Sequence, residues 1–97
     1  MKIYTIVGGV NGVGKSSFTG VLKSRTTDLG VIIDIDKLTA QSGGDPLAGG
    51  RRAVRTMEDC IRGGVSFTQE TTLSSHQVRK TVRRVGELGY HVRLYYI

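Results

Sequence analysis

The chain is poor in the features that mark secreted proteins and membrane proteins. It has one cysteine, Cys60, so no internal disulfide can form, which suits a reducing cytoplasm. The apolar run after Lys2 is too short for a secretory signal and lacks a small-residue cleavage site. No stretch approaches the roughly 20 apolar residues that cross a bilayer. We therefore expect a cytoplasmic protein with no membrane partner.

Aromatic residues are also scarce, at 6% of the chain, and this bears on the meaning of its charge. The formal net charge of +6 favours an anionic partner, a nucleotide or a nucleic acid. Four basic residues lie close together in one predicted helix, namely Arg79, Lys80, Arg83 and Arg84. Few aromatics lie near them, so a stacking platform for single-stranded nucleic acid is not supported. We interpret the cluster as a solvated basic face and do not expect a nucleic-acid partner.

The most specific motif lies near the N-terminus. Residues 9–17 fit the phosphate-binding loop pattern G-x-x-x-x-G-K-[ST] at every fixed position. The predicted nucleotide-binding residues are Gly9, Val10, Asn11, Gly12, Val13, Gly14, Lys15, Ser16 and Ser17. The preceding run, residues 2–7, predicts a buried strand, and a helix should follow, so loop N–H groups and a helix N-terminus face one anion. We expect Lys15 to contact the β- and γ-phosphates and Ser16 to bind magnesium.

Strands and helices alternate along the rest of the chain. The pattern predicts strands over 2–7, 31–36, 65–69 and 90–97, and helices over 15–25, 51–62 and from about 75 to 88. Residues 37–50, with the only proline, are typical of a loop containing a short helical turn. The strand at 31–36 is apolar on both faces, which favours a central position.

This order predicts the fold class and the buried helix faces. We expect a single α/β domain over residues 1–97, a three-layer sandwich of the P-loop NTPase type, with a mostly parallel sheet covered on both sides. The predicted apolar stripes of its helices consist of Phe18, Val21 and Leu22, then Ala53, Val54, Met57, Cys60 and Ile61, then Val78, Val82, Val85 and Leu88. The chain stops inside a strand-like segment, so we expect it to be the N-terminal part of a longer protein.

Three carboxylates follow predicted strands and should share the edge where ligands of such sheets bind. Asp34 and Asp36 end the second strand, and one of them could accept a proton from an acceptor hydroxyl or hold the magnesium shell. Their spacing alone does not assign these roles. Glu70 precedes Thr71 and Thr72, which suits either hydrogen bonding to a polyol or a metal-bound water, or a helix cap. Glu58 faces either the cleft or solvent.

Together these segments resemble the zeta-toxin-like family of P-loop kinases. The likeness rests on residues 9–17, 33–36, 49–52 and 67–74, with the strand after Gly89 also fitting. The likeness spans nearly all of this chain, but it corresponds to only about the first half of a family member. The resemblance implies an ATP- or GTP-dependent kinase whose best-known activity phosphorylates UDP-N-acetylglucosamine and is restrained by an antitoxin.

The resemblance also implies residue roles. Lys15 matches the catalytic nucleotide position, Ser16 a magnesium position, and Asp36 the general base. Glu70 and Thr72 match positions near the substrate, and Glu58 matches one loosely, because its spacing to Glu70 is shorter here. Asp34 is our second expected magnesium ligand. Family members clamp the phosphates with lid arginines that no part of this chain supplies, which would cost roughly 10³ in rate.

Two alternatives stay open at this point. A chain without the arginine lid could be a nucleotide-binding module that does not turn over. The positive charge favours, more weakly, a nucleic-acid-associated ATPase.

Overall fold

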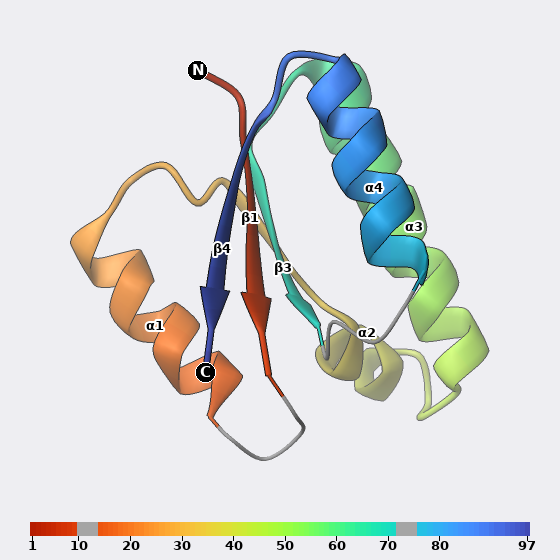
Figure 1. The fold of residues 1–97 in the computed structure, drawn as a ribbon. Helices are drawn as coiled ribbons and strands as arrows, with labels where there is room; N and C mark the ends of the chain where they lie inside the picture. The colour runs from red at the N-terminus through yellow and green to blue at the C-terminus, as the bar shows by residue number, and fades with distance from the viewer. Residues whose placement is uncertain (10–13, 72–75) are drawn as a thin grey trace.

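A computed structural model describes residues 1–9, 14–71 and 76–97, in which strands and helices alternate (Figure 1). The strands are β1 (Ile3–Gly8), β2 (Val31–Asp34), β3 (Phe67–Thr71) and β4 (His91–Tyr96). The helices are α1 (Lys15–Arg25), α2 (Ile35–Gln41), α3 (Pro46–Gly63) and α4 (His76–Glu87). The α/β class and the predicted bounds of the first helix are confirmed. Among the described residues, no helix is long and apolar enough to span a membrane.

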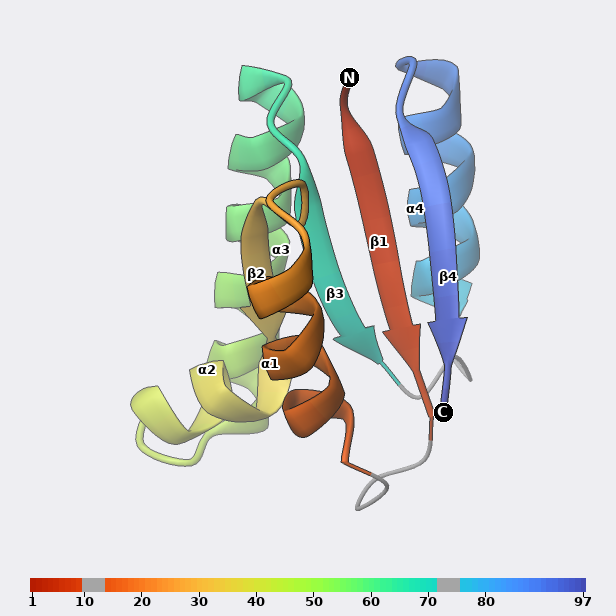
Figure 2. The ribbon, with the colours of Figure 1, turned by 90° about the vertical axis from the view of Figure 1, so that its left-hand side faces the viewer.

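All four strands are parallel, in the order β2-β3-β1-β4 (Figure 2). The prediction that the second strand is central was wrong, because β2 forms one edge of the sheet. The apolar residues on both faces of this strand therefore do not reflect a central position. Ile33 is buried against the core, Ile32 lines a groove on the opposite face, and Val31 remains 40% exposed.

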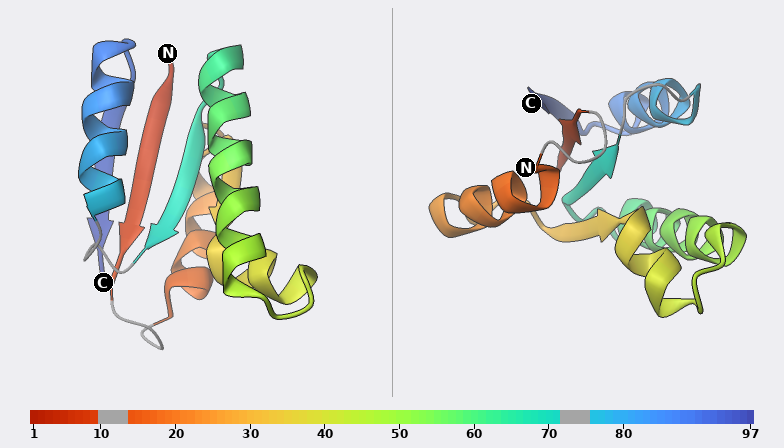
Figure 3. Two further views of the ribbon diagram at one scale, coloured as in Figure 1. Left: turned by 90° about the vertical axis from the view of Figure 1, so that its right-hand side faces the viewer. Right: turned by 90° about the horizontal axis from the view of Figure 1, so that it is seen from below.

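Helices cover both faces of the sheet, as predicted. Helix α1 lies on one face, whereas α3 and α4 lie side by side on the other (Figure 3). Helix α2 follows β2 directly, at the end of the sheet where the strands finish. The layered α/β arrangement inferred from the sequence is therefore present in the described residues.

The two faces of the sheet differ in polarity. Toward α3 and α4 the strands present aromatic rings, with Tyr4 and Phe67 centred 4.8 Å apart and Phe67 and Tyr90 5.7 Å apart. Toward α1, because side chains alternate along a strand, they present a mixed surface, on which Tyr95 of β4 packs against Phe18 of α1 with ring centroids 5.5 Å apart and polar groups are also present. There Thr68 donates a hydrogen bond to the Leu29 carbonyl at 2.8 Å, and Arg93 binds Thr5 Oγ1 at 3.0 Å. The apolar core consequently lies on the α3 and α4 side.

The region predicted as a loop over 37–50 is mostly helical. Asp34 accepts a hydrogen bond from the Lys37 N–H and caps α2, so the second strand ends at Asp34 instead of Asp36. Asp45 caps α3 in the same way, with Pro46 in its first turn. Helix α3 therefore begins five residues before its predicted start at Arg51.

Three residues predicted to be buried are not. Val21 is 51% exposed, Val54 43% and Leu88 46%. Helices α1, α3 and α4 therefore contact the sheet along narrower stripes than predicted. The third strand also lies two residues later than predicted, so Glu70 is within β3.

Helices α2 and α3 pack closely at Gly49. A β-carbon at Gly49 would lie 2.2 Å from Thr39 Oγ1 and 2.7 Å from Thr39 Cα, whereas one at the next residue, Gly50, would meet nothing within 4 Å. The absence of a side chain at Gly49 thus allows α2 to pack closely against α3.

We predict opposite effects for two neighbouring glycine substitutions. Gly49→Ala should lower the free energy of unfolding by about 1–3 kcal/mol, because α2 must shift away. Gly50→Ala should raise it by up to about 1 kcal/mol, because alanine favours a helix. Urea denaturation of both variants measures the difference, and equal effects would contradict the close packing.

A polar cluster ties β4 to the chain between α1 and β2. The Arg93 guanidinium donates to both carboxylate oxygens of Asp28, at 2.9 and 3.0 Å. These hydrogen bonds, together with one from Thr26, hold the pKa of Asp28 below its ordinary value of 3.8. A carboxyl group with a lowered pKa stabilises the folded state above its unfolded pKa, and this stabilisation is lost as the pH falls through the folded pKa.

We predict that Asp28→Asn lowers the Tm at pH 7, and that the difference from wild type shrinks as the pH falls below 3.8. Asp59→Asn is the matched control, because Asp59 forms only an exposed pair with Arg62 at 3.5 Å. Thermal unfolding followed by circular dichroism at several pH values measures both. A Tm difference for Asp28→Asn that does not change with pH would rule out the charged interaction.

Candidate ligand site at the carboxyl ends of the strands

The strand connections diverge between β1 and β3. These strands are neighbours, yet β1 leads through α1 on one face to β2, whereas β3 leads through α4 on the other face to β4 (Figure 3). Such a switch in direction opens a crevice beyond the carboxyl ends of the two strands, where ligands of open α/β sheets bind. The predicted phosphate loop follows β1 and therefore begins at this switch point.

The start of α1 contains described residues of the predicted phosphate loop. Gly14 precedes the helix with φ 88° and ψ 32°, a left-handed conformation that favours glycine. Gly14 has no side chain that could accept hydrogen bonds from the first N–H groups of the helix, and the positive end of the helix dipole lies beside it. Helix α1 has 11 residues, enough for a substantial dipole.

Lys15 is the first residue of α1 and is partly buried. Its Nζ donates a hydrogen bond to the Gly9 carbonyl at 2.8 Å, so its ammonium group reaches from the start of α1 back to the residue that follows β1. The Gly9 N–H in turn donates to the Thr71 carbonyl at 3.2 Å, which joins the start of this loop to the end of β3. The lysine and both ends of the loop are therefore held close to the switch point.

Two predicted site carboxylates lie side by side. Asp34 on β2 and Glu70 on β3 are register partners, and Glu70 is also the partner of Val7 on β1. Register partners in a parallel sheet point to the same face, here the face that α1 covers. Both residues are partly buried, and both line one groove of about 560 Å³. The structure thus brings Asp34 and Glu70 together beside the helix that follows the predicted phosphate loop.

Three further residues of this groove were missed in the sequence. Lys23 and Thr19 line it from α1, and Lys37 lines it from α2. With Lys15, the first two follow the four-residue spacing of one helix face, which is the signal that could have identified them. The groove thus has two lysines and two carboxylates around it, an arrangement that suits a ligand carrying both hydroxyl and anionic groups.

Other predicted site residues lie elsewhere. Asp36 is exposed in the first turn of α2 and is not among the residues that line the groove. Glu58 lies on α3, across the sheet, and accepts two hydrogen bonds from Arg84 on α4, one of them at 2.7 Å. This pairing lowers the pKa of the Glu58 carboxyl. Our prediction that Glu58 contacts the substrate gains no support from its position.

Several predicted residues lie outside the described part of the chain. They are Val10, Asn11, Gly12, Val13 and Thr72, and the side chain of Ser16 is not described either. The magnesium and nucleotide contacts expected of them stay predictions.

The fold and site define an α/β protein with an all-parallel sheet and a candidate ligand site at its carboxyl edge. No family model matches the chain, and no solved structure matches it significantly. The chain is similar to an uncharacterized protein from Haemophilus influenzae, with 30% identity over 95 residues. The match covers 92% of this chain and 65% of the relative's length. These comparisons add a relative but no activity.

Proposed function

We propose that this chain is a nucleotide-binding P-loop phosphotransferase of the zeta-toxin-like type. It binds ATP or GTP with magnesium and transfers the γ-phosphoryl group to a hydroxyl of a small molecule such as a nucleotide sugar. The observation that carries the proposal is the start of α1 at the switch point, with Lys15 hydrogen-bonded to the Gly9 carbonyl and the pair of Asp34 and Glu70 beside α1.

The residues present fit a magnesium–nucleotide ligand. Left-handed Gly14 and the uncapped start of α1 suit a phosphate group, and Lys15 suits its charge. Carboxylate and hydroxyl oxygens are the ligands that magnesium prefers, so Asp34 and Ser16 would hold it, directly or through water. When bound, magnesium neutralises charge on the phosphates. Lys15 would then orient the β- and γ-phosphates toward the groove.

The acceptor molecule would bind in the groove beneath α1, with its reacting hydroxyl outside the groove beside Asp36. Glu70 lines this groove and would accept a hydrogen bond from the acceptor, and Lys23 and Lys37 would hold an anionic part of the acceptor. The resemblance assigns the general base to Asp36, whereas the groove is lined by Asp34. We propose Asp36 as the base, reached by an acceptor that extends past α2, and Asp34 as the metal ligand. We also propose, from the same resemblance, that an antitoxin protein restrains this activity.

A nucleotide-binding module without turnover is the second candidate. The exposed position of Asp36, away from the groove, favours it. Nucleotide affinity without phosphorylated product would distinguish this module from the kinase.

The donor half of the proposal predicts a large effect at one lysine. Lys15→Ala should weaken binding of magnesium-ATP roughly 10- to 100-fold, because a charge-assisted contact worth about 1.5–3 kcal/mol is lost. Lys80→Ala, on α4 across the sheet, should change the affinity less than about twofold. Isothermal titration calorimetry with ATP and GTP measures both variants. Equal affinities for Lys15→Ala and wild type would exclude a phosphate-binding loop.

The acceptor half predicts different effects for the two aspartates. With UDP-N-acetylglucosamine as the acceptor probe, Asp36→Asn should lower transfer of labelled phosphate by about 10²–10⁴-fold with little change in ATP affinity, because a general base is lost. Asp34→Asn should raise the magnesium concentration needed for half-maximal ATP binding. If Asp36→Asn transfers phosphate like the wild type and Asp34→Asn loses transfer, the assignment of the general base to Asp36 is contradicted and Asp34 is the base instead.

A further inference from the structure

The layer formed by α3 and α4 carries most of the net charge of the protein. These helices hold eight basic residues and three acidic ones, a balance of +5 against +6 for the whole chain. The basic residues are Arg51, Arg52, Arg55, Arg62, Arg79, Lys80, Arg83 and Arg84. All of these side chains are exposed. None of them lines the groove beneath α1.

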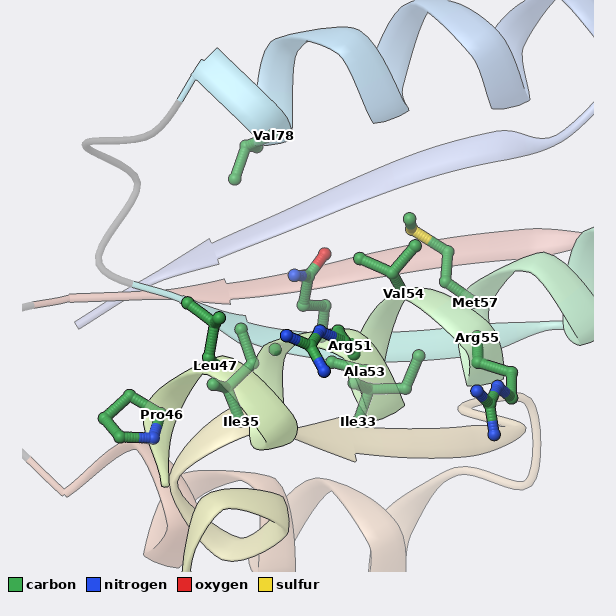
Figure 4. Close-up of a pocket in the computed structure, with 12 residues that line it drawn as sticks. Ile33, Ile35, Pro46, Leu47, Arg51, Ala53, Val54, Arg55, Met57 and Val78 are labelled. Carbon is green, nitrogen blue, oxygen red and sulfur yellow. The ribbon is translucent and has the colours of Figure 1, made fainter. Parts of the chain in front are cut away.

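An apolar groove opens within this basic layer. It has a volume of about 670 Å³, and Figure 4 shows Leu47 and Val54 of α3 on one side of it and Val78 of α4 on the other. Leu47 is 66% exposed and Val54 is 43% exposed, so apolar surface continues from the groove onto its rim. Arg51 and Arg55 also line the groove. Apolar surface and positive charge thus occur at one place.

The most buried polar residue that lines the groove is Gln69. It lies on β3, is 8% exposed, and its Oε1 accepts a hydrogen bond from the buried Tyr4 hydroxyl at 2.7 Å. Because this oxygen already accepts a hydrogen bond, Gln69 would contact a ligand through the N–H groups of its amide. Donors from Gln69, Arg51 and Arg55 all favour an acidic partner.

We propose that this groove binds an acidic amphipathic helix of a partner protein. The apolar stripe of such a helix would fill the groove between α3 and α4, in the helix-in-groove mode of recognition. Its carboxylates would face Arg51 and Arg55, as charge complementarity requires. A nucleic acid fits less well, because the groove is lined by aliphatic side chains and offers no aromatic ring for base stacking among the described residues.

The surface is separate from the candidate ligand site. The sheet lies between the α3 and α4 layer and α1, and the two grooves share no lining residue (Figure 3). Partner binding therefore does not rest on the proposed phosphotransferase activity, and either proposal can fail alone.

The probe for this test is a synthetic helical peptide of about 18 residues, with leucine along one face and glutamate elsewhere. Fluorescence anisotropy should show binding of this peptide to the full 97-residue chain, and at least about tenfold weaker binding of a scrambled peptide of equal composition. The double variant Arg51→Glu and Arg55→Glu should weaken binding at least about tenfold. Leu47→Ser, at an exposed position that folding tolerates, should weaken it about three- to tenfold.

Lys23→Glu on α1 is the matched control, because it also reverses a charge, but on the opposite face. It should change peptide affinity less than about twofold. Equal binding of the scrambled peptide, or equal weakening by Lys23→Glu, would reduce the effect to overall charge and overturn the proposal. Tighter binding of single-stranded DNA or anionic vesicles, lost in the Arg51→Glu and Arg55→Glu variant, would assign the surface to that ligand and overturn it equally.

Discussion

Parallel pairing of β1, β3 and β2 in one register is the constraint on which the candidate site depends. It sets Val7, Glu70 and Asp34 at the same level of the sheet, so the ends of three strands finish together. Because side chains alternate between faces, the same register sends Gln69 toward α3 and Glu70 toward α1. A shift by one residue would exchange these two side chains and remove the carboxylate pair from the groove.

That alternation also explains why the two faces of the protein can serve different purposes. The face under α3 and α4 contains the aromatic core, with Phe67 between Tyr4 and Tyr90, and supplies most of the burial. The face under α1 combines the aromatic contact of Phe18 with Tyr95 and polar contacts, such as the pairing of Arg93 with Asp28, and it contains a polar groove. Stability thus comes mainly from one side of the sheet, and the candidate chemistry lies on the other.

The sequence was sufficient to predict the order of the strands and of α1, α3 and α4, the parallel sheet and the bounds of α1, because glycine positions and apolar periodicity are local signals. It was insufficient where local signals conflict. Ile35 and Asp36 continue a strand-like pattern, but the Asp34 cap starts a helix, which takes Asp36 away from the strand end. Because glycines precede Asp45, the segment was predicted to be a loop, although Asp45 and Pro46 begin helix α3. The contact of Glu58 with Arg84 joins residues 26 positions apart, and no local pattern reports it.

The proposed function requires that a nucleotide triphosphate binds where β1 meets α1. A two-dimensional ¹H–¹⁵N spectrum of the labelled chain, recorded as magnesium-ATP is added, tests this residue by residue. We predict saturable shifts for the amides of residues 9–17 and for Asp34 and Glu70, with the amides of α4 unchanged. No shifts at these amides in the presence of millimolar nucleotide, or shifts confined to the basic surface of α3 and α4, would contradict it.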